Sequence, residues 1–148
     1  MFHFAPDILK VITDCGWNHN REVNIDNCIS PLIAEGYTFT ELSKQILTSF
    51  YGLVISPPKC PLNLFYPSEL VFDPLAAAAG EYVRILYWQF NHNRFYSPIG
   101  SVLDLNIFLI DHLGECYACS MNFYYLGKNF SEAIELLIKA NGNIVPMQ

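Results

Sequence analysis

Three apolar stripes at helical spacing occupy the first third of the chain. The apolar residues at positions 8, 11, 12 and 15 recur at i, i+3, i+4 and i+7, which is one face of an α-helix. Similar stripes cover residues 25–33 and 42–50, so the sequence predicts three helices. The second is expected to begin near Pro31, and the third behind a capping box of Thr38 and Glu41. Each stripe ends in a glycine and a large apolar residue, the pattern of a left-handed helix cap. These pairs are Gly16–Trp17, Gly36–Tyr37 and Gly52–Leu53.

The middle of the chain combines strand-forming segments with a fourth helical pattern. Residues 53–56 and 62–66 are β-branched or aromatic and are bounded by turn residues, so both are predicted to be strands. Asp73 is a natural N-cap and Pro74 suits the first helical position, which predicts one long helix reaching residue 90. Gly80 should weaken this helix by ~1 kcal/mol relative to alanine. Its expected buried face consists of Leu75, Ala79, Val83, Leu86 and Phe90.

The last third reads as a hairpin followed by a helix. Residues 101–111 alternate, which predicts a strand with residues 103, 105, 107 and 109 facing the core. A turn at 111–114 then leads into a partner strand over 115–126. Asn129 and Glu132 open a final helix that Gly142 is expected to end. The sequence therefore predicts an α+β fold in one domain spanning 1–148, with N-terminal helices, a central antiparallel sheet and a C-terminal helix packed on it.

Charge and composition narrow the classes of partner. The 148 residues carry a formal net charge of −6, whereas nucleic-acid binding requires a basic face. No apolar run approaches the ~20 residues of a membrane span, and the N-terminus lacks the pattern of a secretory signal. We therefore expect a cytoplasmic protein whose five cysteines are free thiols, with a basic protein as partner.

The segment "CYAC" at residues 116–119 is the strongest candidate for chemistry. In a strand, Cys116 and Cys119 point to opposite faces, too far apart for a disulfide or a shared zinc ion. His112 is the best available third ligand but falls in the expected turn. The pair is interpreted as one core thiol and one half-exposed thiol, and no cofactor or metal is expected. A small metal or thiol enzyme centred on these three residues is one hypothesis for the function, ranked below two protein-binding hypotheses given below.

Six segments in order resemble the third family of the SUKH superfamily. They are "CGWNHNREVNI", "SFYGLVI", "LVFDPLAA", "YSPIG", "LIDHLGECY" and "LGKNFSEAIELLI". The chain departs from the family pattern at Tyr51, where glycine is frequent. The motif residues are expected to have structural roles. They are Gly16, Trp17, Arg21, Gly52, Leu53, Asp73, Pro74, Pro98, Gly100, Asp111 and Gly114.

The resemblance implies a non-catalytic α+β protein of a bacterial polymorphic toxin system. Such immunity proteins bind a cognate toxin, often a nuclease, and neutralise it by occlusion inside the producing cell. A scaffold or regulator of the same fold that binds some other protein is the alternative hypothesis.

A partner-binding surface is predicted from exposed aromatic side chains and a neighbouring carboxylate. The alternative is that each aromatic lines the core from a second face. The predicted residues are Leu64, Tyr66, Glu69, Tyr87 and Trp88.

Overall fold

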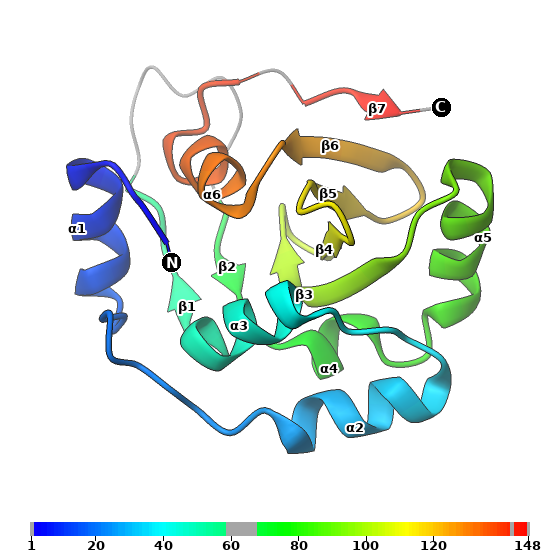
Figure 1. Ribbon diagram of the computed structural model, residues 1–148. Coiled ribbons are helices and arrows are strands. Elements are labelled where there is room, and N and C mark those ends of the chain that lie inside the picture. Colours follow the sequence, from blue (N-terminus) through cyan, green and yellow to red (C-terminus); the bar gives the residue numbers. More distant parts are fainter. Residues whose placement is uncertain (1, 59–67, 143, 148) are drawn as a thin grey trace.

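One antiparallel sheet forms the middle of the fold, and helices cover both of its faces (Figure 1). The computed structural model describes residues 2–58, 68–142 and 144–147. The helices in these ranges are α1 (Pro6–Asp14), α2 (Asp26–Glu35), α3 (Glu41–Phe50), α4 (Pro74–Ala78), α5 (Tyr82–His92) and α6 (Phe130–Lys139). The strands are β1 (Val54–Ile55), β2 (Leu70–Val71), β3 (Tyr96–Val102), β4 (Asn106–Asp111), β5 (Cys116–Cys119), β6 (Phe123–Gly127) and β7 (Pro146–Met147). The predicted α+β class, with N-terminal helices and a C-terminal helix, is confirmed.

The strands pair in chain order, each antiparallel to the next. In β4 the four residues Ile107, Phe108, Leu109 and Ile110 are all buried. Phe108 and Ile110 face a core cluster shared with α1, α3 and α6, whereas Ile107 and Leu109 face a second cluster shared with α4 and α5. The continuous apolar run of β4 thus follows from burial on both faces of the sheet.

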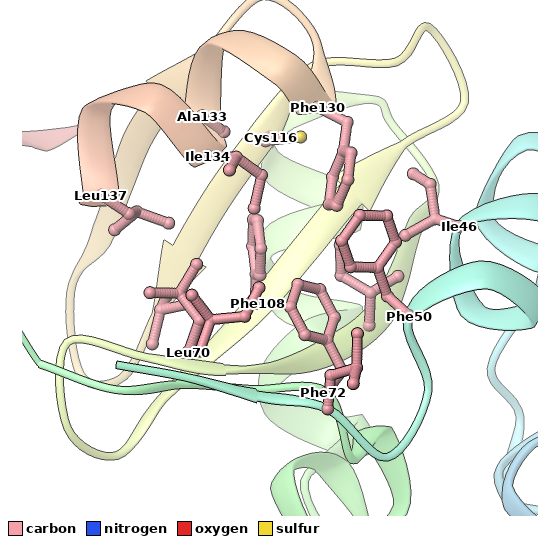
Figure 2. Close-up of a cluster of buried hydrophobic side chains, with 14 of the residues drawn as sticks. Ile46, Phe50, Leu70, Phe72, Phe108, Cys116, Phe130, Ala133, Ile134 and Leu137 are labelled. Atoms are coloured by element: carbon pink, nitrogen blue, oxygen red, sulfur yellow. The ribbon is translucent and has the colours of Figure 1, made fainter. Parts of the chain in front are cut away.

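Four phenylalanine rings from separate parts of the chain meet in the first cluster (Figure 2). Phe50 of α3 lies 5.1 Å from both Phe72 and Phe130, measured between ring centroids. Phe108 stacks on Phe130 of α6 at 6.2 Å, which joins the closing helix to the central strand. Such aromatic pairs add ~0.5–1.5 kcal/mol each beyond their burial.

Both long strands expected in the last third are hairpins instead. Leu103 and Asp104 have φ of 49° and 66°, so the chain turns there and Leu105 is exposed rather than in the core. The expected strand over 115–126 is divided at Ser120, whose N–H donates to Asn122. The turn at Asp111–Gly114 between β4 and β5 was predicted correctly.

The helices are confirmed in number at the N-terminus, but several of their ends differ from prediction. α2 begins at Asp26 with Pro31 in its interior, because Cys28, Ile29 and Leu32 on either side of the proline are buried. The N-cap of α3 is Thr40, whose hydroxyl accepts from the Ser43 N–H, and not Thr38. α6 ends at Lys139, and its C-cap Ala140 takes the left-handed conformation that was expected at Gly142.

The helix predicted from 74 to 90 is broken into α4 and α5. Asp73 caps α4 and Pro74 is its first residue, as predicted. Gly80 has φ +80°, which interrupts the helix rather than merely weakening it. The strand expected at 62–66 lies outside the described residues.

Substitutions at Gly52 test the cap between α3 and the sheet. It has φ +87°, and its N–H donates to the Phe72 carbonyl at 2.8 Å. Gly52→Val should lower the free energy of unfolding by ~1–3 kcal/mol, because a β-branched residue is strained at positive φ. Gly52→Asn is the matched control and should cost less, since asparagine tolerates this region. Equal denaturant midpoints for wild type and Gly52→Val would contradict this account.

Candidate functional site

Helix α5 is fixed at its start by residues from the end of α2. One carboxylate oxygen of Glu35 accepts from the Gly80 N–H at 2.9 Å, and the other accepts from the Tyr82 N–H at 3.1 Å. The Tyr37 hydroxyl donates to the Ala78 carbonyl at 2.8 Å. Gly36 lies against the Tyr82 ring, where an added Cβ would come within 2.6 Å. These contacts satisfy the backbone at the break and set the direction in which α5 runs.

The inward face of α5 packs into the second core cluster. Ile85 is fully buried, and the half-buried Trp88 lies 5.1 Å from Phe123 between ring centroids. One turn later, His92 Nδ1 shares a hydrogen bond of 2.8 Å with the Tyr96 hydroxyl. α5 is therefore anchored along its length.

The outward face of α5 is also apolar. Val83 is 80% exposed, Leu86 46%, Tyr87 61% and Phe90 88%. Their spacing of i, i+3, i+4 and i+7 places them on one side of the helix, and we call them the α5 stripe. The prediction that Val83, Leu86 and Phe90 belong to the core is wrong, as is that for Ala79, which is exposed. Contiguous exposed apolar patches of this kind mark interaction sites.

The residues proposed from sequence for partner binding lie on separate elements. Tyr87 belongs to the α5 stripe, whereas Trp88 sits beside it with its ring against the core. Glu69 is exposed just before β2, where it accepts from the Ser56 hydroxyl at 3.2 Å. Leu64 and Tyr66 lie outside the described residues. Binding by any of these residues remains a prediction.

A groove of ≈ 810 Å³ lies on the described surface. It opens between the N-terminal segment, α3, the β4–β5 turn and the start of α6. Three of the chain's eight Lys and Arg residues line it, namely Arg21, Lys44 and Lys128, together with the carboxylates Glu22 and Glu41. The mixed charge suits polar contacts with a protein.

The cysteines of "CYAC" are buried on opposite faces of the sheet. Cys116 packs in the first core cluster and Cys119 in the second, which confirms the predicted geometry. Both are fully buried, so the expectation of a half-exposed thiol is wrong. Burial raises the pKa of Cys119 to about 11 and that of Cys116 further above its ordinary value, so both are neutral thiols at pH 7. Across the described residues, no group of three His, Cys, Asp or Glu side chains could hold a metal ion.

Similarity to known proteins identifies the family of this chain. A family model described as SUKH-3 immunity protein matches residues 4–140. The chain belongs to the SUKH-3 immunity protein family. Searches of curated proteins and of solved structures gave no match. Among the described residues, no helix is long and apolar enough to cross a membrane.

The first SUKH-3 motif holds the end of α3. The Trp17 indole N–H donates to the Ser49 hydroxyl at 2.8 Å. The Arg21 guanidinium donates to the carbonyls of Ser49 and Tyr51, both at 2.7 Å. These carbonyls are among those that a helix leaves without partners at its C-terminus. Leu53, which follows Gly52 in the second motif, is buried directly after this end.

The later SUKH-3 motifs shape the sheet. A side chain at Gly100 would meet the Val71 carbonyl at 2.2 Å, so glycine permits β3 to approach β2. The register of β3 with β4 shifts between Pro98 and Gly100. Asp111 is buried at the β4–β5 turn, where its Oδ1 accepts from the N–H groups of Leu113 and Glu115, both at 2.9 Å. Gly114 completes this turn at φ +97°.

Arg94 balances the charge of the buried Asp111. Its guanidinium donates to Asp111 Oδ2 and to Glu115, and the Tyr117 hydroxyl donates to the same Asp111 oxygen at 2.9 Å. Hydrogen bonds to Glu115 and Asp111 raise the pKa of Arg94 above its already high ordinary value, so the cation persists at any working pH. A buried carboxylate with this many donors is a structural hub for the hairpin.

The cysteine pair gives a direct test of thiol or metal function. The double variant Cys116→Ala/Cys119→Ala should lower the free energy of unfolding by ~1–3 kcal/mol through lost packing. The matching Ser/Ser variant should lose more, because it buries two hydroxyls. Partner affinity should stay within about tenfold of wild type in folded protein, and purified wild type should contain no stoichiometric zinc. Bound zinc, or lost binding in a folded double variant, would reverse this interpretation.

Proposed function

We propose that this protein is the immunity partner of a secreted bacterial toxin, which it binds and neutralises by occlusion in the cytoplasm of the producing cell. The observation that carries the proposal is the SUKH-3 family match over residues 4–140. Immunity proteins act by binding a toxin. An exposed apolar face on a well-anchored helix suits such a binding role. A toxin that acts on nucleic acid, such as a nuclease, would carry the basic surface that an acidic partner attracts.

Acidic side chains give the surface its long-range character. The chain carries 14 Asp and Glu against 8 Lys and Arg. Glu69 and Asp104 are both exposed, and they lie close together because the Asp104 N–H donates to the hydroxyl of Ser68 at 3.3 Å. A negative surface of this kind attracts a basic protein from a distance and raises the association rate.

Co-expression tests the proposed function. Any toxin domain encoded beside this chain's gene is expressed in a sensitive host with and without this protein. We expect the wild-type protein to restore growth and to form a one-to-one complex with the purified toxin domain. Toxicity that persists despite abundant folded protein would reject an immunity role and would favour the scaffold or regulator of the same fold.

Salt should separate the electrostatic part of binding from the rest. The association rate should fall by roughly tenfold or more between 0.1 M and 1 M salt, as the Debye length shortens from ~10 Å to ~3 Å. The dissociation rate should change far less, because short-range contacts set it. In low salt, the double variant Glu69→Gln/Asp104→Asn should also slow association. The control is Lys10→Gln/Asp14→Asn, which removes an exposed ion pair without changing the net charge. An association rate that ignores salt would reject steering.

A further inference from the structure

We propose that the α5 stripe is the toxin-docking surface and that it inserts into an uncharged apolar groove on the toxin domain. This inference rests on the proposed function and names the surface and the chemistry of its partner. Val83, Leu86, Tyr87 and Phe90 are the anchors. A hydrophobic groove typically binds a helix through side chains at i, i+3, i+4 and i+7.

The first support is that the stripe is apolar although the fold does not need it for its core. The inward face of α5 already supplies Ile85 and part of Trp88 to the second cluster. Four large exposed side chains on one helix face amount to on the order of the 300–600 Å² of the largest apolar patch on a typical monomer, which is often functional. The exposed apolar residues Leu105 and Met121, at 92% and 90%, lie on two hairpin turns and form no such helix face.

The second support is that α5 is held rigidly before any partner arrives. Glu35 accepts from the N–H of Gly80, just before α5, and from that of Tyr82, its first residue. Asn93 closes the helix in the left-handed conformation, with its N–H donating to the Gln89 carbonyl. The Trp88 and Phe123 rings fix the middle. A surface already in its bound shape loses little conformational entropy on binding, so more of the contact energy appears as affinity.

The charges on α5 define the chemistry of the partner. Arg84 lies next to the stripe, and its guanidinium pairs at 2.9 Å with Glu81, the N-cap of the same helix. The stripe therefore presents no net charge to a partner. A groove with unpaired charged groups would have to desolvate them without compensation, which costs several kcal/mol. The matching surface is apolar and neutral, with the toxin's basic groups outside it, where the acidic remainder of this chain can attract them.

A second copy of this chain is a poorer occupant. Two stripes facing each other would bury on the order of 1,000 Å² in total, below the ~1,200 Å² at which specific interfaces begin. Both would also be convex, so the flanks of each helix would stay wet. A groove surrounds the helix and reaches its flanks, which enlarges the contact without another element.

Binding to the purified toxin domain from the neighbouring gene tests the inference. Phe90→Ala and Tyr87→Ala should each raise the dissociation constant by at least about 30-fold, mainly through faster dissociation. Leu86→Asp should abolish protection of co-expressing cells. Leu105→Ala and Met121→Ala are matched controls at equal or greater exposure, and Met121→Asp controls for the added charge; all three should stay within about threefold. Circular dichroism and the unfolding midpoint should match wild type in every variant, since these side chains lie outside the core.

Each outcome decides between the surface and the function. Lost binding in folded stripe variants, with intact controls, supports both. Wild-type affinity and protection in all stripe variants would overturn the surface and leave the immunity role standing. A solution dimer of this chain that Leu86→Asp dissociates would assign the stripe to a second copy and overturn the toxin as occupant. Failure of the wild-type protein to bind or protect would overturn the function, and this inference with it.

Discussion

Burial of the sheet on both faces is the constraint on which the rest of the structure depends. It requires apolar side chains at successive positions of the central strands, as in β4, and it requires helices above and below. It also explains the cysteines. Cys116 and Cys119 fill opposite clusters as small apolar residues, and burial that raises their pKa removes them from thiolate chemistry.

The α5 stripe departs from the usual consequence of this constraint. A helix that covers one face of a sheet buries one side and turns the other to solvent, so its outer side is normally polar. In α5 the outer side is apolar as well, and the break at Gly80 decides which side that is. Glu35 holds the backbone of Gly80 and Tyr82, so α5 does not continue the axis of α4. The side chains that would share a face with Leu75 in one continuous helix are therefore turned out of the core.

Much of the fold could be predicted from sequence, and the failures have a common physical origin. Caps that depend on one residue and its neighbours, such as Asp73 and Asn129, were found because their hydrogen bonds are local. Pro31 inside α2 and the break at Gly80 were missed because distant residues decide them. The hairpin at Leu103 was missed because alternation continued across the turn, and its left-handed residues are not glycine.

The candidate site shows the same limit more sharply. The apolar period in residues 83–90 was detected, but a periodic stripe predicts a buried helix face without saying what buries it. Local patterns that disagree with the global fold concentrate at functional sites, and a core-like stripe on the outside is such a disagreement. The sequence therefore predicted a buried face from Val83, Leu86 and Phe90, whereas the fold leaves these residues exposed.

In the proposed complex, acidic charge and the apolar stripe act over two different distances. Charge acts over a Debye length, is weakened by salt and governs how often the partners meet. The stripe acts only in contact, is insensitive to salt and governs how long they stay together. An immunity protein needs both, because a toxin must be captured quickly at low concentration and then held without turnover. Placing the two on separate residues, with Arg84 neutralised by Glu81 beside the stripe, lets each change without loss of the other.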